Sequence, residues 1–185
     1  MFEELIDGHV IKTMFREHEH ILNILDELHN LGEQLSEQNN SKNKKLLPQI
    51  NQLSINLISA EPHHQREEQV LFKAMEELGI SGPPQVMRME HEVMREMKHD
   101  LKSETENSDG DWPVQVAKVC QLISALCSNL RQHIDKEDNI LYPMALQSIT
   151  DAAKWEEMKV RCDEIGYCCF CPSEKKDLDT SPVNN

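Results

Sequence analysis

Aromatic residues are scarce in this chain: Phe, Trp and Tyr make up 4% of its 185 residues. A β-sandwich or β-barrel core draws heavily on aromatic and β-branched side chains, so this composition disfavours both architectures. Positive charge is also in deficit, because 33 acidic residues outnumber 19 basic ones and leave a formal net charge of −14. A nucleic acid or an anionic membrane surface is therefore an unfavourable partner.

Long apolar runs are missing as well. No stretch approaches the roughly 18 apolar residues of a membrane span. The start of the chain, MFEELIDGHVIK, lacks the basic residues and apolar core of a secretory signal. Four of the six cysteines crowd the last part of the chain instead of spreading out as a disulfide framework would. We therefore expect a cytoplasmic protein with reduced thiols, built as one domain plus a tail.

Helical periodicity dominates what is present. Apolar residues recur at three- and four-residue spacing over four long stretches, residues 8–35, 45–78, 84–102 and 113–146. Pro62 falls inside the second stretch and should kink or split that helix, because proline lacks a backbone donor. Short connections between these stretches predict an all-α fold, an up-down-up-down four-helix bundle.

The bundle is expected to occupy residues 1–147. A short helix over residues 151–161 should follow, within a C-terminal segment, residues 148–172, that is rich in cysteine. Residues 173–185 are polar and are expected to form a disordered tail.

A His–Glu pattern occurs twice, as HHQREEQVLF from His63 and as HIDKEDNILYP from His133. Residues four apart lie on the same face of a helix, so His133 and Glu137 share a face. That face continues through an apolar row that we expect to point inward: Leu126, Leu130, Ile140, Leu141 and Met144. Aligning Leu71-Phe72 with Leu141-Tyr142 places His63 on His133 and Glu67 on Glu137. A buried carboxylate costs several kcal/mol unless it is paired, and a metal ion would pair it.

The other two helices each add one inward histidine. His18 lies seven residues after Ile11, and His91 lies four after Met87. One inward histidine is usually an ordinary core residue, but four of them with two matched glutamates are hard to explain that way. The set suits two metal ions, since imidazole binds Fe, Zn or Cu and carboxylates bridge metals in helix bundles, whereas a single zinc needs three or four ligands.

Two further histidines need a separate interpretation. His64 fits the inward row at least as well as His63, so either or both are candidate ligands. His20 has polar neighbours, Glu17 among them, and is expected on a solvated face.

At these residues the chain resembles the hemerythrin-like, HHE cation-binding family. The matching segments REHEHILNIL, HHQREEQVLF, GPPQVMRMEHEVM and HIDKEDNILYP stand in family order over about residues 8–147. The resemblance implies a four-helix bundle with a non-haem di-iron site, two Fe ions bridged by an oxo group and carboxylates. It implies that the ligands are His18, His63, Glu67, His91, His133 and Glu137, with Glu67 and Glu137 as the bridges.

The chain departs from the oxygen-carrying hemerythrins in two places. Arg95 stands four residues after His91, where those proteins have a further histidine. On the fourth helix the acid is Glu137, four residues after His133, whereas those proteins use an aspartate five residues after the histidine. Fewer histidines leave more open positions for exogenous ligands, so simple reversible oxygen carriage is not implied.

The segment CDEIGYCCFCP resembles a tail that follows HHE modules in some bacterial and archaeal proteins. Its four cysteines are candidate redox thiols or metal ligands, although their spacing matches no strong metal motif: Cys162, Cys168, Cys169 and Cys171. The alternative is that they are small residues packing the tail onto the bundle.

Three functions remain open from the sequence. The protein binds or senses O2 or NO and reports this to a protein partner; or it is an enzyme that reduces NO or peroxide; or it stores or donates iron. The enzyme reading is strengthened by the VMR-x-EH motif, which resembles proteins that repair iron–sulfur centres under nitrosative stress.

Overall fold

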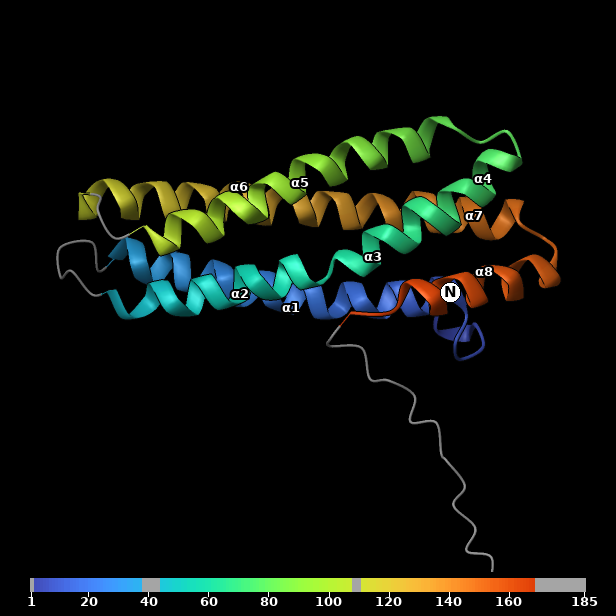
Figure 1. The fold of residues 1–185 in the computed structure, drawn as a ribbon, viewed down its shortest axis with the longest axis horizontal. Helices are drawn as coiled ribbons and strands as arrows, with labels where there is room; N and C mark the ends of the chain where they lie inside the picture. The colour runs from blue at the N-terminus through green and yellow to red at the C-terminus, as the bar shows by residue number, and fades with distance from the viewer. Residues whose placement is uncertain (1, 38–43, 108–110, 169–185) are drawn as a thin grey trace, which may run out of the picture.

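The computed structural model describes residues 2–37, 44–107 and 111–168. It is built from helices lying side by side along one long axis, and no strand occurs among these residues (Figure 1). The main helices are α1 (Val10–Glu37), α2 (Leu47–Ser59), α3 (Glu61–Arg66), α4 (Phe72–Glu77), α5 (Gly82–Glu106), α6 (Trp112–Lys136), α7 (Tyr142–Ser148) and α8 (Ala152–Ile165). Short 3₁₀ turns precede α1 and α2, at Phe2–Glu4 and Lys44–Leu46. The predicted all-α bundle is confirmed.

The second predicted helix is divided, as Pro62 indicated. Helix α2 ends at Ser59, and Pro62 lies in the first turn of α3, where its missing N–H removes no helical hydrogen bond. Helices α3 and α4 are joined by a π-helical turn, Glu67–Leu71, and an equivalent turn, Glu137–Leu141, joins α6 to α7. The second stretch is therefore interrupted twice, between α2 and α3 and at its π turn, and the fourth stretch once, at its π turn.

The π turns correct one assignment. Ile140 was expected to point inward, but its side chain is 56% exposed. A π turn holds more residues than an α turn, so the residue three positions after Glu137 rotates away from the inward face. Leu141 and Tyr142 take the buried positions instead.

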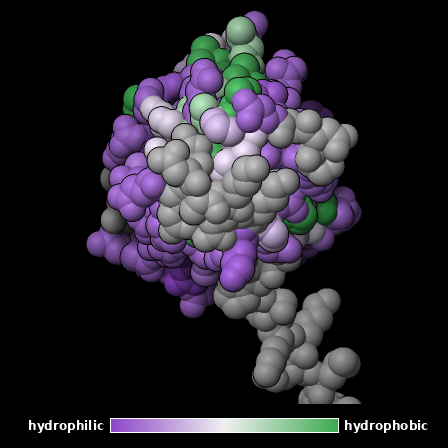
Figure 2. Space-filling view, turned by 90° about the vertical axis from the view of Figure 1, so that its left-hand side faces the viewer, coloured by the Kyte–Doolittle hydropathy of each residue, from purple (hydrophilic) through white to green (hydrophobic). Residues whose placement is uncertain are grey.

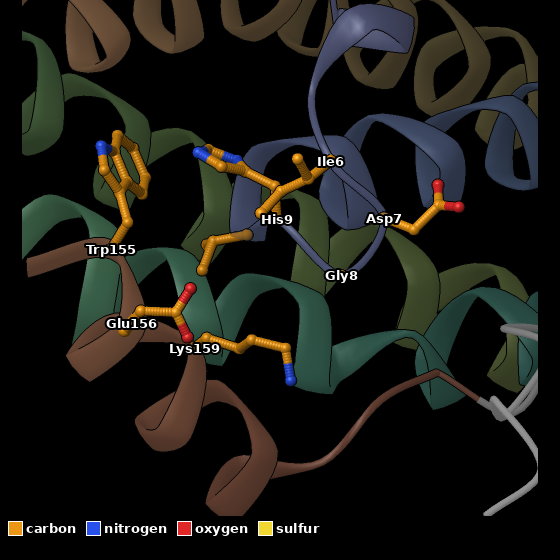
Figure 3. Close-up of a pocket in the computed structure, with 8 residues that line it drawn as sticks. Ile6, Asp7, Gly8, His9, Trp155, Glu156 and Lys159 are labelled. Carbon is orange, nitrogen blue, oxygen red and sulfur yellow. The ribbon is translucent and has the colours of Figure 1, made fainter. Parts of the chain in front are cut away.

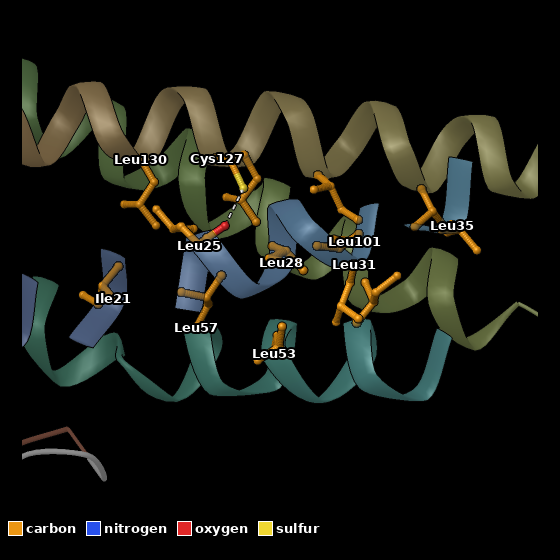
Figure 4. Close-up of a cluster of buried hydrophobic side chains, with 14 of the residues drawn as sticks. Ile21, Leu25, Leu28, Leu31, Leu35, Leu53, Leu57, Leu101, Cys127 and Leu130 are labelled. Atoms are coloured by element: carbon orange, nitrogen blue, oxygen red, sulfur yellow. Dashed lines mark hydrogen bonds between the residues drawn. The ribbon is translucent and has the colours of Figure 1, made fainter. Parts of the chain in front are cut away.

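Two apolar clusters fill the bundle, and a polar layer lies between them. The larger cluster is leucine-rich and holds Leu25, Leu28 and Leu57; Cys127 also packs there, its thiol 3.6 Å from the Leu25 carbonyl oxygen (Figure 4). The smaller cluster contains Met14, Leu71, Met87 and Tyr142. Along each long helix, the predicted histidine falls between the residues of these two clusters.

The ends of the later helices differ modestly from expectation. Helix α5 runs to Glu106 rather than to residue 102, and α8 runs to Ile165 rather than to residue 161. Asp151 caps α8 by accepting a hydrogen bond from the Ala153 N–H. Gly166 then turns the chain with a φ of 92°, a left-handed value that favours glycine. Cys169, Cys171 and the predicted tail, 173–185, lie outside the described residues.

The surface is largely polar, as the many charged residues of the sequence lead one to expect. Seen from the end where α1 finishes and α2 begins, the surface of the described residues is mostly hydrophilic, with a hydrophobic patch near the top of the view (Figure 2). Among the described helices, none combines the length and apolar character that crossing a membrane requires.

Candidate metal centre

The polar layer brings together all six residues that the sequence singled out. Their side chains are at most 2% exposed: His18, His63, Glu67, His91, His133 and Glu137. They form two groups whose candidate ligand atoms lie within 4.8 Å of one another. The first group joins His18 and His63 to both glutamates, and the second joins His91 and His133 to Glu137.

Each of these four histidines is held by a carboxylate at its outer ring nitrogen. The Nδ1 atoms of His18 and His63 donate to Asp138 and Glu17 over 2.8 and 2.7 Å. In the same way, His91 Nδ1 donates to Glu68 and His133 Nδ1 donates to Glu90, both over 2.8 Å. A carboxylate oriented in this way fixes the ring and raises the basicity of the inner nitrogen, as around metal-bound histidines.

The inner ring nitrogens face one another in pairs. His18 Nε2 lies 3.0 Å from His63 Nε2, and His91 Nε2 lies 3.0 Å from His133 Nε2. A carboxylate can only accept, so Nδ1 carries the proton and a neutral ring points its Nε2 lone pair at its partner. Two lone pairs at this separation repel unless a proton or a metal ion lies between them. Burial acts against a charged ring, but hydrogen bonds to Asp138 and Glu137 raise the pKa of His18 to about 10, while burial lowers the pKa of His63 to about 4. In the metal-free protein His18 can therefore supply that proton, and a metal ion would take its place. The donor set therefore fits a metal ion at each pair.

The two glutamates each reach both histidine pairs. Glu137 Oε1 lies 2.9 Å from His133 Nε2, and its Oε2 lies 3.3 Å from His18 Nε2. Glu67 Oε2 lies 3.5 Å from His63 Nε2 and 3.4 Å from His91 Nε2. Although these contacts are close, Glu67 Oε2 and Glu137 Oε1 are buried without a hydrogen-bond partner. Unpaired carboxylate oxygens between two imidazole pairs have the arrangement that a bridging ligand requires.

The surroundings of Glu67 and Glu137 shift the pKa values of these two carboxyl groups in opposite directions. Burial and the neighbouring Glu137 charge raise the pKa of Glu67 well above its usual value. Burial also acts to raise the pKa of Glu137, but His133, His18 and His91 surround that carboxylate and lower its pKa well below the usual value. In the metal-free protein the ionised form is thus favoured at Glu137 and the protonated form at Glu67.

Tyr142 completes the inner wall, and sequence reasoning gave it no role. Its hydroxyl donates to Glu67 Oε1 over 2.7 Å and lies 3.3 Å from His18 Nε2. The ring stacks on His18 with a centroid distance of 5.5 Å. Burial, with the charges of Glu67 and Glu137 added, raises the pKa of Tyr142, so the phenol stays protonated and acts as a donor.

His64 lies beside the centre, outside both ligand groups. Its ring stacks on His91 at 4.0 Å between centroids, and its Nδ1 is buried with no hydrogen-bond partner. The nearest acid is Glu61, 3.6 Å from that nitrogen. Unlike the four paired histidines, His64 is therefore not oriented by a hydrogen-bonded carboxylate.

Sequence reasoning also missed the four outer carboxylates, and one assignment was wrong. Glu17 was grouped with the solvated surroundings of His20, but Glu17 is fully buried, and Arg66 Nη2 lies 2.6 Å from its carboxylate. Their position in the sequence, directly beside a candidate ligand, could have identified them. Each outer carboxylate stands next to a candidate ligand in the sequence and reaches a histidine on another helix: Glu17, Glu68, Glu90 and Asp138.

The described part of the cysteine-rich segment packs against this outer layer. Cys168 is buried, with its backbone N–H 3.5 Å from Glu17 Oε1 and its thiol 3.6 Å from the Ala60 carbonyl oxygen. Burial raises the pKa values of Cys162 and Cys168 to about 12, which keeps both as protonated thiols. These two cysteines have the features of packing residues.

A surface pocket lies away from the histidine layer. It occupies about 90 Å³ between the start of α1 and helix α8, and Asp7, His9, Trp155 and Glu156 line it (Figure 3). The His9 ring packs on Trp155 at 4.6 Å between centroids. No candidate metal ligand lines this pocket.

Comparison with known proteins agrees with this geometry. The family model described as the Hemerythrin HHE cation binding domain matches residues 9–145. A search of curated proteins gave no match. The matched range contains all six candidate ligands and all four outer carboxylates. Since it covers most of the 185 residues, the chain belongs to the hemerythrin HHE cation-binding family.

Proposed function

We propose that this protein is a non-haem di-iron protein that binds O2 or NO in the core of the helix bundle. The observation that carries the proposal is the facing of two imidazole pairs, each with its outer nitrogens held by carboxylates. His18 and His63 would hold one iron, and His91 and His133 the other. Glu67 and Glu137 would bridge them. Mixed imidazole and carboxylate donors in a helix bundle suit iron.

Bound iron would supply redox chemistry and coordination positions for O2, NO or peroxide. The protein supplies the surroundings. Apolar clusters on both sides of the polar layer exclude water from the ligands. The Tyr142 hydroxyl holds Glu67 and offers a proton at a fixed position. The outer carboxylates keep all four imidazole rings aimed inward.

The test is metal content together with an absorption spectrum, recorded on anaerobically purified protein before and after addition of O2 or NO. We expect about two irons per chain and a new absorption band on exposure to either gas. His133→Ala should lose iron, while His29→Ala, on an exposed histidine of α1, should keep it. One zinc per chain with a featureless spectrum would overturn the proposal.

An enzymatic role is the second candidate, and Tyr142 favours it. A buried phenol donating to a carboxyl group of raised pKa would supply a proton for the reduction of NO or peroxide. Consumption of either substrate beyond one equivalent per centre would establish turnover. Iron storage has weaker support, because ligands that are at most 2% exposed and individually oriented disfavour rapid metal exchange.

We further propose a cytoplasmic location and, for a sensing role, a protein partner that reads the state of the centre. The described cysteines are free thiols, which is ordinary in a reducing compartment.

A further inference from the structure

The carboxylate of Glu17 is more deeply buried than the other three outer carboxylates. The side chains of Asp138, Glu68 and Glu90 are 18%, 22% and 29% exposed. That of Glu17 is 0% exposed. All four accept a hydrogen bond from a histidine Nδ1 atom, so the difference lies in what covers them from outside. The Glu17 carboxylate therefore has a cover that the other three lack.

Residues 166–168, which we call the C-terminal strap, form this cover together with Arg66. Arg66 Nη2 lies 2.6 Å from each carboxylate oxygen of Glu17, and the guanidinium carbon lies 4.7 Å from the centroid of the Tyr167 ring. The Cys168 backbone N–H faces Glu17 Oε1 over 3.5 Å, and the Cys168 thiol lies 3.9 Å from Arg66 Nη2. The strap therefore closes the outer side of the Glu17 carboxylate.

Two features of the chain fix the strap in this place. Helix α8 lies against α1 and α3 (Figure 1), and Arg161 near its end donates to the Gln69 carbonyl oxygen over 3.2 Å. Gly166 then takes a φ of 92° and a ψ of −179°, a combination essentially restricted to glycine. A Cβ atom at Gly166 would meet nothing within 4 Å, so glycine is required there by the backbone turn alone. That turn directs the strap back onto the bundle.

Glu17 connects the strap to a candidate metal ligand. Its Oε2 atom accepts a hydrogen bond from His63 Nδ1 over 2.7 Å, while His63 Nε2 faces the centre. Exclusion of water strengthens such a contact, because electrostatic attraction grows in surroundings of low dielectric constant. A carboxylate held in this way fixes the imidazole ring and raises the basicity of its inner nitrogen. In the second ligand group, the carboxylates that orient the histidines, Glu68 and Glu90, stay partly exposed.

We propose that the C-terminal strap is a positioning element of the metal centre, which holds His63 through Arg66 and Glu17 and sets the affinity of the ion at the first ligand group. The inference rests on the proposed di-iron function and specifies how one half of that centre is controlled. The two ions become inequivalent, because binding of the first depends on residues beyond the matched family range, 9–145, and binding of the second does not. Displacement of the strap loosens the first ion and leaves the second in place.

The first test compares Gly166→Val with Gly79→Val, a control between α4 and α5, in the full-length protein. Both replace a glycine of positive φ, 92° and 82°, whose Cβ atom would meet nothing within 4 Å. Each therefore strains one backbone turn without filling packed space. In chelator competition on iron-loaded protein, we expect Gly166→Val to lower the affinity for one iron about 10- to 100-fold and to leave the other within about threefold of the parent. Gly79→Val should bind both irons as the parent does.

The second test uses metal-free protein, so it decides the inference even when the di-iron proposal fails. NMR on protein with isotope-labelled histidine follows the exchange of the His63 Nδ1 proton with solvent, and His63→Gln assigns its signal. Because Glu17 is the fully buried outer carboxylate, this proton should exchange more slowly than the Nδ1 protons of His91 and His133. Gly166→Val should speed its exchange at least about tenfold by opening the cover, with the other two protons unchanged.

Three results would overturn the inference. One is an equal loss of affinity for both irons in Gly166→Val, which would indicate general destabilisation. Another is a His63 Nδ1 proton that exchanges equally fast in the parent and in Gly166→Val. The third concerns Cys168→Ala, which keeps the backbone N–H that faces Glu17. If Cys168→Ala lost as much iron affinity as Gly166→Val, the thiol and not the cover would be responsible.

A further variant keeps the test decisive if Gly166→Val does not fold. Tyr167→Ala removes the exposed part of the cover, because the Tyr167 side chain packs on Arg66 from outside and is 39% exposed. It must then speed the exchange of the His63 Nδ1 proton and weaken one iron more than the other. Parent-like exchange in Tyr167→Ala would show that the strap does not shield Glu17. The iron content of the parent is measured first, so a failure of the di-iron proposal is recognised separately.

Discussion

The segments His63–Phe72 and His133–Tyr142 have the same local design and different chemistry. Each places a histidine four residues before a glutamate, starts a π turn at that glutamate and ends the turn on a buried leucine. Their surroundings differ. Three histidines surround Glu137 and lower its pKa against the effect of burial, whereas burial and the charge of Glu137 raise the pKa of Glu67, although the Tyr142 hydrogen bond acts to lower it. Two identical residues in equivalent positions thus become a fixed anion and a protonatable group.

The two segments also differ in their last residue. The second segment ends in Phe72 and the fourth in Tyr142, so the centre has one phenol on one side. Tyr142 reaches across the bundle and donates to Glu67, a contact that acts to lower the pKa of Glu67 but is outweighed by burial and by the charge of Glu137. The centre is consequently asymmetric, although its two HxxxE segments are alike.

The largest expected effect comes from removing each glutamate in turn. Glu137→Gln should abolish binding of both irons, because Glu137 belongs to both ligand groups. Glu67→Gln should keep at least one iron, since the group of His91, His133 and Glu137 stays intact. Iron per chain, measured by mass spectrometry, gives the answer. Equal losses in the two variants would mean that the glutamates are equivalent after all.

A smaller effect is expected from the outer carboxylates. Glu17→Gln and Glu90→Gln each leave a candidate ligand in place but weaken the contact that orients it, in the second and fourth segments respectively. We expect iron affinity to fall about 10- to 100-fold in each. Glu33→Gln, on an exposed glutamate of α1, serves as control. Competition with a chelator measures the affinity, and unchanged affinity in both variants would remove the outer carboxylates from the site.

The phenol contact should contribute less. Tyr142→Phe leaves the buried Glu67 Oε1 atom without its donor, at about 1–3 kcal/mol in the free energy of unfolding. For a chain of this length, that corresponds to a melting temperature lower by roughly 2–4 °C per kcal/mol. Tyr167→Phe removes a hydroxyl contact made at the surface, to Asp163, and should change the melting temperature very little. Calorimetry on metal-free protein compares the two.

The smallest expected effect is a pair of melting-temperature shifts in opposite directions, measured on metal-free protein. The folded-state pKa of Glu67 is raised, so its favourable contribution is complete below about pH 4.5 and declines as pH rises through the folded pKa. The folded-state pKa of Glu137 is lowered, so its contribution is present above about pH 4.5 and is lost in acid. At pH 7, Glu67→Gln should therefore raise the melting temperature and Glu137→Gln should lower it. Shifts in the same direction would show that the two surroundings do not differ as described.

Much of the site could be predicted from residue spacing. The four-residue interval from His133 to Glu137 fixes both on one face of a helix, and an apolar row around them fixes that face as inward. Pro62 predicted the break before α3. Such features are local, because they depend on the helical repeat and on the chemistry of single residues.

The π turns could not be predicted in this way, and neither could their consequence for Ile140. An extra residue in one turn shifts the helical phase, and this becomes favourable only when Glu137, Leu141 and Tyr142 all find buried partners. Glu17 was misplaced for a similar reason. Its surface-like neighbours in the sequence say nothing of Arg66, which reaches it from another helix.

The sequence by itself determined an all-α bundle of the hemerythrin HHE family with histidines and glutamates aimed at its core, because helical periodicity and adjacent motifs are properties of the chain alone. The tertiary structure decided which carboxylate orients which histidine and which of the two glutamates stays charged. Those outcomes depend on distances between helices and on the burial of charge, and both arise only when the four segments pack together.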